Sequence, residues 1–191
     1  MVQIKTDLLK LKEQVENCKK CDLWKGRNKA VFGEGYESAE VMLIGLGPGY
    51  NEDQQGRPFV GAAGKLLDKL LALAGLKREE VYIANVIKSY LPDNKPKKEQ
   101  IAACTPYLDK QVEIIKPKTI VLLGNVAVKY IFEKFKLPKA PMRDIHVKPF
   151  SVASLFLKAK VIPMYHPAAA LRNPGLRSTI EEDWEKIKDV L

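Results

Sequence analysis

Four short apolar runs, separated by segments whose apolar residues follow helical spacing, constrain this fold more than any other feature. The runs are VMLIG at 41–45, VYIANVI at 81–87, TIVLL at 119–123 and VIPM at 161–164. Helices are expected at 65–74, 97–103, 105–115 and 125–135, with a first helix from Thr6 or Asp7 to Asn17 and a last helix capped by Ser178 or Thr179. Segment 137–160 is expected to be irregular or to contain short strands. This alternation predicts an α/β fold with a central, mainly parallel four-stranded sheet and helices on both faces.

Length and composition favour a single domain that spans residues 1–191. No apolar run is long enough to cross a membrane, and the charged, amphipathic N-terminus is unlike a signal sequence. We therefore expect a cytoplasmic protein without membrane contact. The formal net charge of +9 favours a polyanionic partner such as nucleic acid, although a solvated lysine-rich surface gives the same count.

A glycine-rich loop follows the first apolar run, and residues 45–64 read GLGPGYNEDQQGRPFVGAAG. Glycines at the end of a strand let backbone N–H groups approach a ligand closely. The dinucleotide fingerprint needs a third glycine where this chain has Tyr50, and the phosphate-binding loop needs Ser or Thr where it has Leu66. From the loop alone, a structural turn and a ligand pocket remain equally good interpretations.

Three loops follow the carboxyl ends of predicted strands, at 45–61, 85–94 and 166–175. In an open α/β sheet these ends meet at one crevice, where ligands bind. The three loops are therefore expected to build one site together. His146 lies in the irregular segment, and we expect it at the surface.

The three cysteines favour metal or cluster ligation over disulfides. Cys18 and Cys21 form a C-x-x-C pair at the end of the first helix, and Cys104 lies far along the chain. An odd count argues against a disulfide framework, and the pair lacks the βαβ context of a redox dithiol. Iron–sulfur clusters and structural zinc both use such thiolates.

The motifs, taken together, resemble family 4 uracil-DNA glycosylases, which carry an iron–sulfur cluster. The resemblance runs from Cys18 to about Pro174, and it rests on GLGPG, ED, GRPFVGAAGKLL, YIANVIK, Cys104 before PYL, VLLG and HPAAALRNP in the family's order. Two positions depart from the family pattern. Leu46 stands where the family usually has an acidic residue, and Ser89 stands where it usually has a cysteine.

The resemblance implies a pocket that removes uracil from DNA. Asn85 is expected to recognise the uracil edge and Phe59 to stack on the flipped base. His166 is expected to stabilise the departing oxygen. The loop residues of the substrate pocket are expected to be Leu46, Gly47, Pro48 and Gly49.

The remaining expected roles concern water, DNA and the cluster. Glu52 or Asp53 is expected to orient water or to stabilise the cationic sugar. The loop of Pro167, Leu171 and Arg172 is expected to insert an apolar wedge into the base stack and to contact a phosphate.

The resemblance also implies a cluster site formed by Cys18, Cys21, Ser89 and Cys104. A 4Fe-4S cluster is expected there, with a three-iron cluster, zinc or no metal as alternatives because of Ser89. No nucleotide cofactor is implied.

The implied function is a monomeric DNA repair enzyme of base excision, associated with the nucleoid, that hydrolyses the N-glycosidic bond of uracil. The alternative function, prompted by Leu46, is a cluster-bearing DNA-binding or redox protein on the same scaffold.

Overall fold

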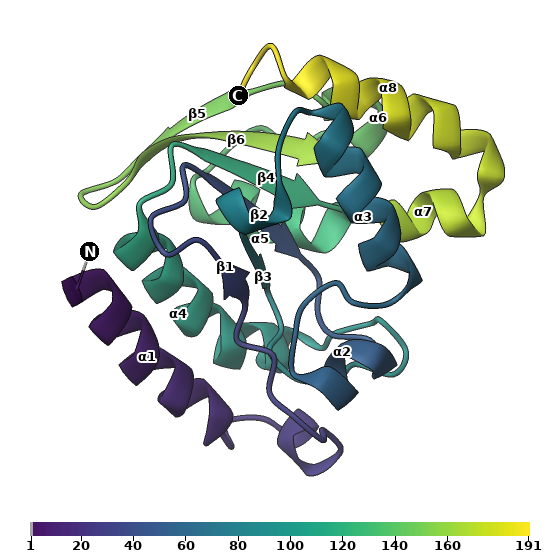
Figure 1. The fold of residues 1–191 in the computed structure, drawn as a ribbon. Coiled ribbons are helices and arrows are strands. Elements are labelled where there is room, and N and C mark those ends of the chain that lie inside the picture. The colour runs from purple at the N-terminus through teal and green to yellow at the C-terminus, as the bar shows by residue number, and fades with distance from the viewer. Residues whose placement is uncertain (1) are drawn as a thin grey trace.

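A six-stranded sheet lies at the centre of the computed structural model, which describes residues 2–191 (Figure 1). Its strands are β1 (Glu34–Gly35), β2 (Val41–Gly45), β3 (Tyr82–Asn85), β4 (Thr119–Leu123), β5 (Phe150–Ala153) and β6 (Lys158–Met164). Their order in the sheet is β1-β3-β2-β4-β6-β5. The four predicted strands form the parallel centre, β3-β2-β4-β6, and the short strands β1 and β5 pair antiparallel at the two edges. The α/β prediction is confirmed, with two edge strands more than expected.

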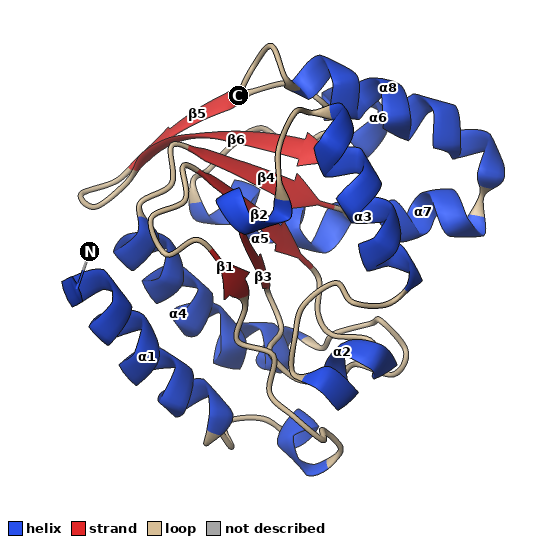
Figure 2. Ribbon diagram, in the orientation of Figure 1, coloured by secondary structure: helices blue, strands red, loops and turns tan. Residues whose placement is uncertain are grey.

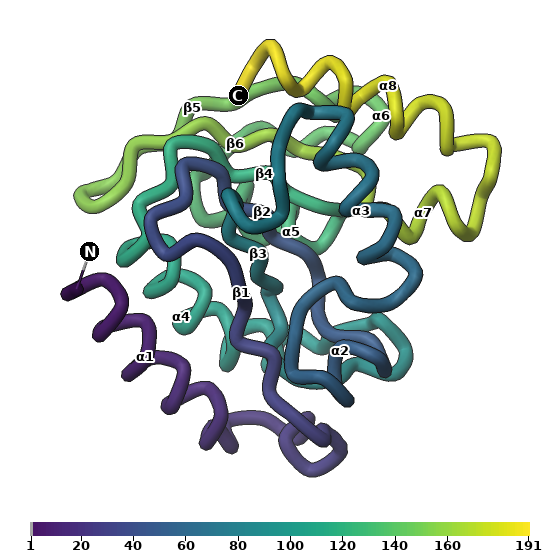
Figure 3. The backbone as a smooth tube through the Cα atoms, viewed as in Figure 1, coloured from purple at the N-terminus to yellow at the C-terminus, as the bar shows by residue number. Residues whose placement is uncertain are grey.

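Helices cover both faces of the sheet, as predicted (Figure 2). They are α1 (Val2–Glu16), α2 (Tyr50–Gln55), α3 (Ala62–Leu73), α4 (Lys98–Ile115), α5 (Asn125–Lys134), α6 (Met142–Ile145), α7 (Pro167–Arg172) and α8 (Arg177–Ile187), with 3-10 turns at Asp22–Lys25, Arg78–Glu80 and Pro174–Leu176. The backbone trace shows α1 running alongside α4 (Figure 3).

The central strands bury both of their faces, which explains why they appear in the sequence as continuous apolar runs. Met42 and Ile44 pack toward Leu108 of α4 and Phe132 of α5. Leu43, between them, packs in a second core with residues of α3 and α8. Successive side chains of a strand point to opposite faces, so one five-residue strand contributes to both cores.

Several helix boundaries differ from the sequence-based expectation. The two helices expected at 97–103 and 105–115 are one helix, α4, with Pro106 inside it. Proline removes one backbone hydrogen bond, but burial of Cys104, Tyr107 and Leu108 on the same face of α4 compensates for that loss.

The expected helix caps were wrong at both ends of the chain. Helix α1 includes Val2, ahead of the predicted caps, and the Thr6 hydroxyl donates to the Val2 carbonyl inside the helix. Helix α8 begins at Arg177 without a side-chain cap, because a 3-10 turn capped by Asn173 leads directly into it.

Two segments expected to be loops contain short helices. Helix α2 lies inside the glycine-rich loop, and α7 lies inside the loop after β6. Segment 137–160, expected to be irregular or to contain short strands, contains β5 and the start of β6, and also the short helix α6. Within the described residues, no helix has the length and apolar character needed to cross a membrane.

Candidate active site

A cavity of about 550 Å³ opens at the carboxyl ends of the parallel strands. The predicted site residues that line it are Leu46, Gly47, Gly49, Glu52, Phe59, Asn85, His166 and Arg172. A second cavity of about 510 Å³ lies beside Val41 and Thr119, at the amino ends of their strands. Open α/β sheets bind ligands at the carboxyl ends, so the first cavity is the candidate site, and we call it the main pocket.

Asn85 places a buried polar atom at the main pocket. It is the last residue of β3 and pairs in register with Gly45 of β2. Its side chain is only 2% exposed, and no group within residues 2–191 donates a hydrogen bond to its Oδ1 atom. Buried polar atoms in folded proteins nearly always have a partner. An unpartnered oxygen in a pocket wall therefore points to a ligand with a hydrogen-bond donor.

Gly45 makes room for the Asn85 side chain. A Cβ atom at position 45 would lie 2.5 Å from Asn85 Oδ1 and 2.7 Å from Phe59 Cζ. Neither distance is compatible with normal packing. The first glycine of the loop is thus required by two pocket side chains rather than by a turn.

His166 carries a neutral imidazole with a defined tautomer. It caps α7, and its Nδ1 atom accepts a hydrogen bond from the Ala168 amide at 3.1 Å. The proton of the neutral ring is therefore on Nε2. Burial, and to a smaller extent the charge of Arg172, lower the pKa of His166 to about 4, against the opposing effect of Glu52. At neutral pH the ring offers an uncharged N–H donor.

Phe59 supplies an apolar ring beside this imidazole. The two rings stack with their centroids 5.5 Å apart and their planes 24° from parallel. Phe59 has a φ of 51°, a left-handed conformation that is uncommon for a residue with a side chain. Such local strain is typical of functional sites and persists only where the surroundings fix it.

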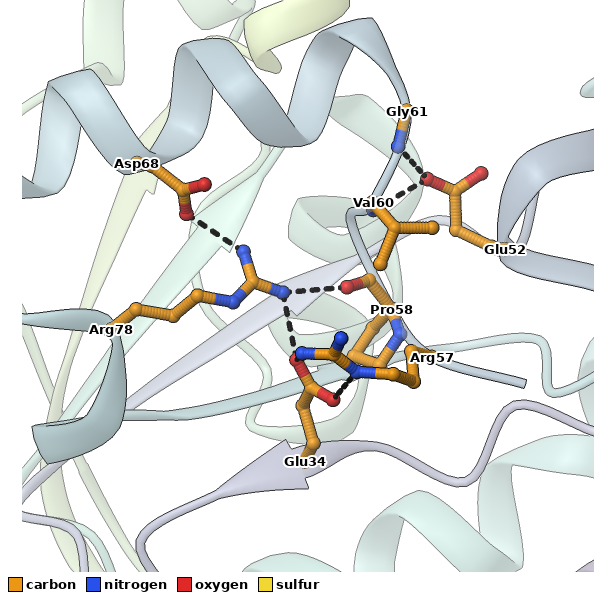
Figure 4. Close-up of polar contacts among 8 residues, drawn as sticks. All are labelled: Glu34, Glu52, Arg57, Pro58, Val60, Gly61, Asp68 and Arg78. Carbon is orange, nitrogen blue, oxygen red and sulfur yellow. Dashed lines mark hydrogen bonds and ion pairs between the residues drawn. The ribbon is translucent and has the colours of Figure 1, made fainter. Parts of the chain in front are cut away.

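Hydrogen bonds on both sides of Phe59 fix that conformation (Figure 4). On the amino side, Arg78 Nη2 donates to the Pro58 carbonyl at 2.6 Å. The same guanidinium donates to Glu34 at 3.0 Å and to Asp68 at 2.8 Å, and Arg57 donates to Glu34 at 2.7 Å. Burial works to raise the pKa of Glu34, but the two arginines hold it below its ordinary value. The sequence analysis missed this network, because its members lie far apart in the chain.

Glu52 fixes the carboxyl side of Phe59. Its Oε1 atom accepts from the amides of Val60 at 2.8 Å and Gly61 at 2.9 Å (Figure 4). Glu52 lines the main pocket, whereas Asp53 does not. The Asp53 carboxylate is 3% exposed and accepts from the Asn28 amide at 2.9 and 3.0 Å. The structure thus places Glu52 in the site and Asp53 in the contact between α2 and the segment before β1.

The other residues of the glycine-rich loop also fall into two groups, those that line the main pocket and those that are buried behind it. Leu46, Gly47 and Gly49 line the main pocket, while Pro48 is buried behind it. The Pro48 carbonyl accepts from the Leu91 amide at 3.2 Å, which ties this loop to the loop after β3. The side chain at position 46 is apolar, so the main pocket has one carboxylate in this loop, that of Glu52.

Helix α7 carries the residues expected to contact DNA. Pro167 occupies its first turn and is buried. Arg172 lines the main pocket, and its Nε atom donates to the Ala168 carbonyl at 3.3 Å. Leu171 is 50% exposed, so a large apolar side chain projects beside a cation at the edge of the main pocket.

His146 was expected at the surface and is instead partly buried behind the main pocket. Its Nδ1 atom lies 2.7 Å from Asp183 Oδ2, and its ring packs against Tyr165 at 5.1 Å between centroids. Tyr165 lines the main pocket next to His166. Burial raises the pKa of Asp183, while His146 lowers it.

The three cysteines gather where α1 ends against α4. Cys104 is buried, and Cys18 and Cys21 are half-buried. Burial raises the pKa of Cys104, and the nearby Cys21 and Cys18 thiols act in the same direction. Within residues 2–191, no three His, Cys, Asp or Glu side chains are arranged to hold a single metal ion.

Ser89 lies behind this region and is 3% exposed. Its hydroxyl accepts a hydrogen bond from Arg27 Nη1 at 3.1 Å, and Arg27 Nη2 donates to the Glu16 carbonyl at 2.6 Å. The serine hydroxyl is thus engaged by an arginine that also closes the end of α1.

Comparison with known proteins agrees with this geometry. The model of the uracil DNA glycosylase superfamily matches residues 32–188. The chain belongs to this superfamily. It is 49% identical to the Type-4 uracil-DNA glycosylase of Sulfurisphaera tokodaii, over 96% of this chain and 84% of that protein. The Type-4 uracil-DNA glycosylases of Saccharolobus solfataricus and Thermotoga maritima are 45% and 40% identical, over 94% of this chain and 84% and 92% of theirs.

Proposed function

We propose that this protein is a uracil-DNA glycosylase of base excision repair, with residues 1–191 acting as one glycosylase domain. The observation that carries the proposal is the unpartnered, buried Asn85 Oδ1 in a cavity that also presents a neutral His166 N–H and the ring of Phe59. These three groups match the edge, the leaving oxygen and the face of a flipped uracil.

Asn85 accounts for the choice of base. Uracil presents an N3–H donor and an O4 acceptor, and cytosine presents the opposite pattern. The Asn85 amide accepts from N3–H of uracil and donates to its O4 atom. Cytosine would leave these buried polar groups unpaired. Sites built on such hydrogen bonds reject the wrong ligand by about 10⁴-fold or more.

His166 accounts for the rate of bond cleavage. When the N-glycosidic bond breaks, the sugar gains cationic character and uracil leaves as an anion. The Nε2–H of His166, held by the Nδ1 contact to Ala168, donates to the uracil oxygen on which charge develops. One such donor contributes about 2.7–4 kcal/mol to the transition state.

Glu52 is the carboxylate that faces the sugar. One of its oxygens is occupied by the Val60 and Gly61 amides, so the other remains to orient water or to stabilise the sugar cation. The apolar Leu46 adds no charge of its own. We therefore assign water activation to Glu52.

The direct test uses one oligonucleotide with a central uracil and matched oligonucleotides with thymine or cytosine at that position. We expect alkaline treatment after incubation to break only the uracil strand, because only that strand gains an abasic site. Tight DNA binding without strand breakage would support the alternative, a cluster-bearing DNA-binding or redox protein prompted by Leu46.

The pKa of His166 gives a prediction that needs no substrate. The chain has only two histidines, so ring resonances in a His146→Gln variant report His166 alone. We expect them to stay constant from pH 8 to pH 5.5 and to titrate near the pKa of about 4, below the ordinary value of about 6.5. Arg172→Gln should raise the pKa, because it removes a nearby positive charge. A midpoint near 6.5 in the folded protein would contradict the half-buried, neutral imidazole.

Leu171 and Arg172 should contribute to DNA engagement in different ways. Arg172→Ala should weaken binding to any sequence and reduce the salt slope by about one phosphate contact. Leu171→Ala should keep that slope but lose the wedge that offsets unstacking of the target base. Its rate defect should be large on paired duplex and small on single-stranded uracil-DNA. Equal defects on both substrates would show that Leu171 acts inside the main pocket instead.

The cysteine region supports a further proposal, an iron–sulfur cluster of the 4Fe-4S type held by Cys18, Cys21 and Cys104. Three neighbouring thiols are the donors that such clusters use, and a cluster spans several metal atoms, so its ligands stand farther apart than those of one ion. Ser89 would offer a weaker oxygen donor as a fourth ligand, and its hydroxyl already accepts from Arg27. The group would supply structure, by tying the end of α1 to α4 and the segment after β3.

Metal content tests the cluster proposal. Protein purified without oxygen should be brown and contain iron and sulfide. Cys104→Ser should lose iron, and Ser89→Cys should raise iron occupancy, since it adds a fourth thiolate. Cys104→Ala serves as the control for the packing effect of the serine hydroxyl. A colourless protein with stoichiometric zinc would overturn the proposal.

DNA is the proposed partner, in single- or double-stranded form, and the net charge of +9 favours its approach. We further propose that the enzyme acts as a monomer in the cytoplasm, at the nucleoid. The proposed reaction is a hydrolysis of the N-glycosidic bond by water, so the proposal calls for no nucleotide cofactor.

A further inference from the structure

A cavity of about 530 Å³ lies between α5 and the segment leading into α6, and its walls meet those of the main pocket. Asn125 and Met142 line both cavities. We call this cavity beside α5 the side groove. The two spaces share two wall residues, so the side groove adjoins the main pocket at Asn125 and Met142.

The floor of the side groove is apolar. Phe132 and Ile145 close its base, and both are buried in the core. Ala140 and Pro141 form an exposed edge, ahead of Met142. Apolar walls of this kind suit the flat face of a nucleobase, which stacks well on apolar and aromatic groups. This stacking tolerates any sequence, because every base has such a face.

Two lysines lie at the rim of the side groove. Lys139 is paired with Glu133 at 3.2 Å. Lys129 is exposed on α5, and within residues 2–191 its ammonium forms no ion pair. An unpaired cation beside an apolar floor matches a nucleotide, which carries one phosphate next to one flat base.

We infer that the side groove binds the nucleotide adjacent to the target uracil on the same strand, with its base on the apolar floor and its phosphate near Lys129. The inference rests on the proposed function, since it takes uracil as the occupant of the main pocket. Neighbouring nucleotides are covalently linked, so the neighbour of a seated uracil must leave through the mouth of the main pocket. The groove that shares Asn125 and Met142 is an adjoining space with room for a base.

The experiment removes one base at a time from the substrate. Single-stranded oligonucleotides carry a central uracil, and either neighbour is replaced by a tetrahydrofuran abasic residue that keeps the phosphate. For the wild-type enzyme we expect kcat/KM to fall about tenfold when one of the two neighbours, 5′ or 3′ of the uracil, loses its base. Loss of the other neighbour's base should have little effect.

Two matched variants locate the effect in the side groove. Ala140→Glu places a carboxylate on its edge, and we expect this enzyme to treat intact and abasic-neighbour substrates alike. Pro138→Glu makes the same change of charge two residues away, outside the groove lining, and should keep the tenfold difference. Lys129→Gln should weaken binding of both substrates equally, while Lys5→Gln on α1 should change neither.

Three outcomes would overturn the inference. The first is a wild-type enzyme whose kcat/KM is insensitive to both abasic neighbours. The second is an Ala140→Glu enzyme that keeps the tenfold difference between intact and abasic-neighbour substrates. The third is a Pro138→Glu enzyme that loses this difference. The first result would also be expected if the groove served a protein partner. In each case uracil would still be released from the intact oligonucleotide, so the proposed function would stand. Absence of release from every substrate would instead defeat the proposed function itself.

Discussion

His166→Ala is expected to lower the rate of uracil release by about 10²-fold or more in single-turnover assays, the effect of losing one oxyanion donor. The imidazole is half-buried, neutral and held by the Ala168 amide, so its Nε2–H is already oriented when the base begins to leave. Alanine keeps the backbone of the helix start but removes the donor. A single-turnover rate isolates the chemical step from product release.

Asn85→Asp should cost a similar factor for a different reason. The carboxylate keeps an acceptor for uracil N3–H but loses the donor to O4, and it places a charge in a site that is 2% exposed. Asn94→Asp is the matched control, because Asn94 also lines the main pocket but lies in an exposed loop. Unchanged rates in both His166→Ala and Asn85→Asp would remove the basis for the site assignment. Thermal melts of each variant separate loss of chemistry from loss of folding.

The parallel centre of the sheet could be predicted because burial on both faces leaves a plain signal. Each central strand is a continuous apolar run, as VMLIG at β2 shows. The edge strands carry no such signal. Strand β1 has two residues, and β5 has an alternating burial pattern over four. Their pairing depends on neighbours that are distant in sequence, so local patterns missed them.

The short helices were missed for a related reason. Helices α2 and α7 have six residues each, too few to show an apolar period. Their stability comes from tertiary contacts, such as the bonds between Asp53 of α2 and the Asn28 amide. Pro106 misled in the other direction. Proline suits the first position of a helix, which predicted that a second helix begins there, but α4 continues through it.

The sequence indicated which groups line the main pocket but not what holds them. Motif residues such as Asn85 and His166 follow strands whose ends meet, so their convergence could be anticipated. The support of Phe59 by Arg78 and Glu34 joins positions on three separate segments. Lys88 gives a stronger example, because a lysine is expected at the surface. It is instead 2% exposed, donating to the carbonyl of Phe32 and to Gln111, and burial lowers its pKa to about 7.

Gly45→Ala should abolish most of the activity while adding a single methyl group. Its Cβ atom would lie 2.5 Å from Asn85 Oδ1 and 2.7 Å from Phe59 Cζ, so both side chains must move. Displacement of a recognition group by about 1 Å can cost 10²-fold, and here two groups are displaced together. We expect kcat/KM for uracil-DNA to fall by more than 10²-fold, with a smaller fall in melting temperature from overpacking.

Two further variants distinguish the loss of geometry from general damage. Gly26→Ala adds the same methyl group where no atom lies within 4 Å of the new Cβ, so activity and melting temperature should both be retained. Gly45→Ala combined with Phe59→Leu relieves the contact with the ring and should recover stability. Activity should stay low, because the Asn85 contact remains and the stacking ring is gone. Full activity in Gly45→Ala would mean that Asn85 and Phe59 do not need the positions that make them a uracil pocket.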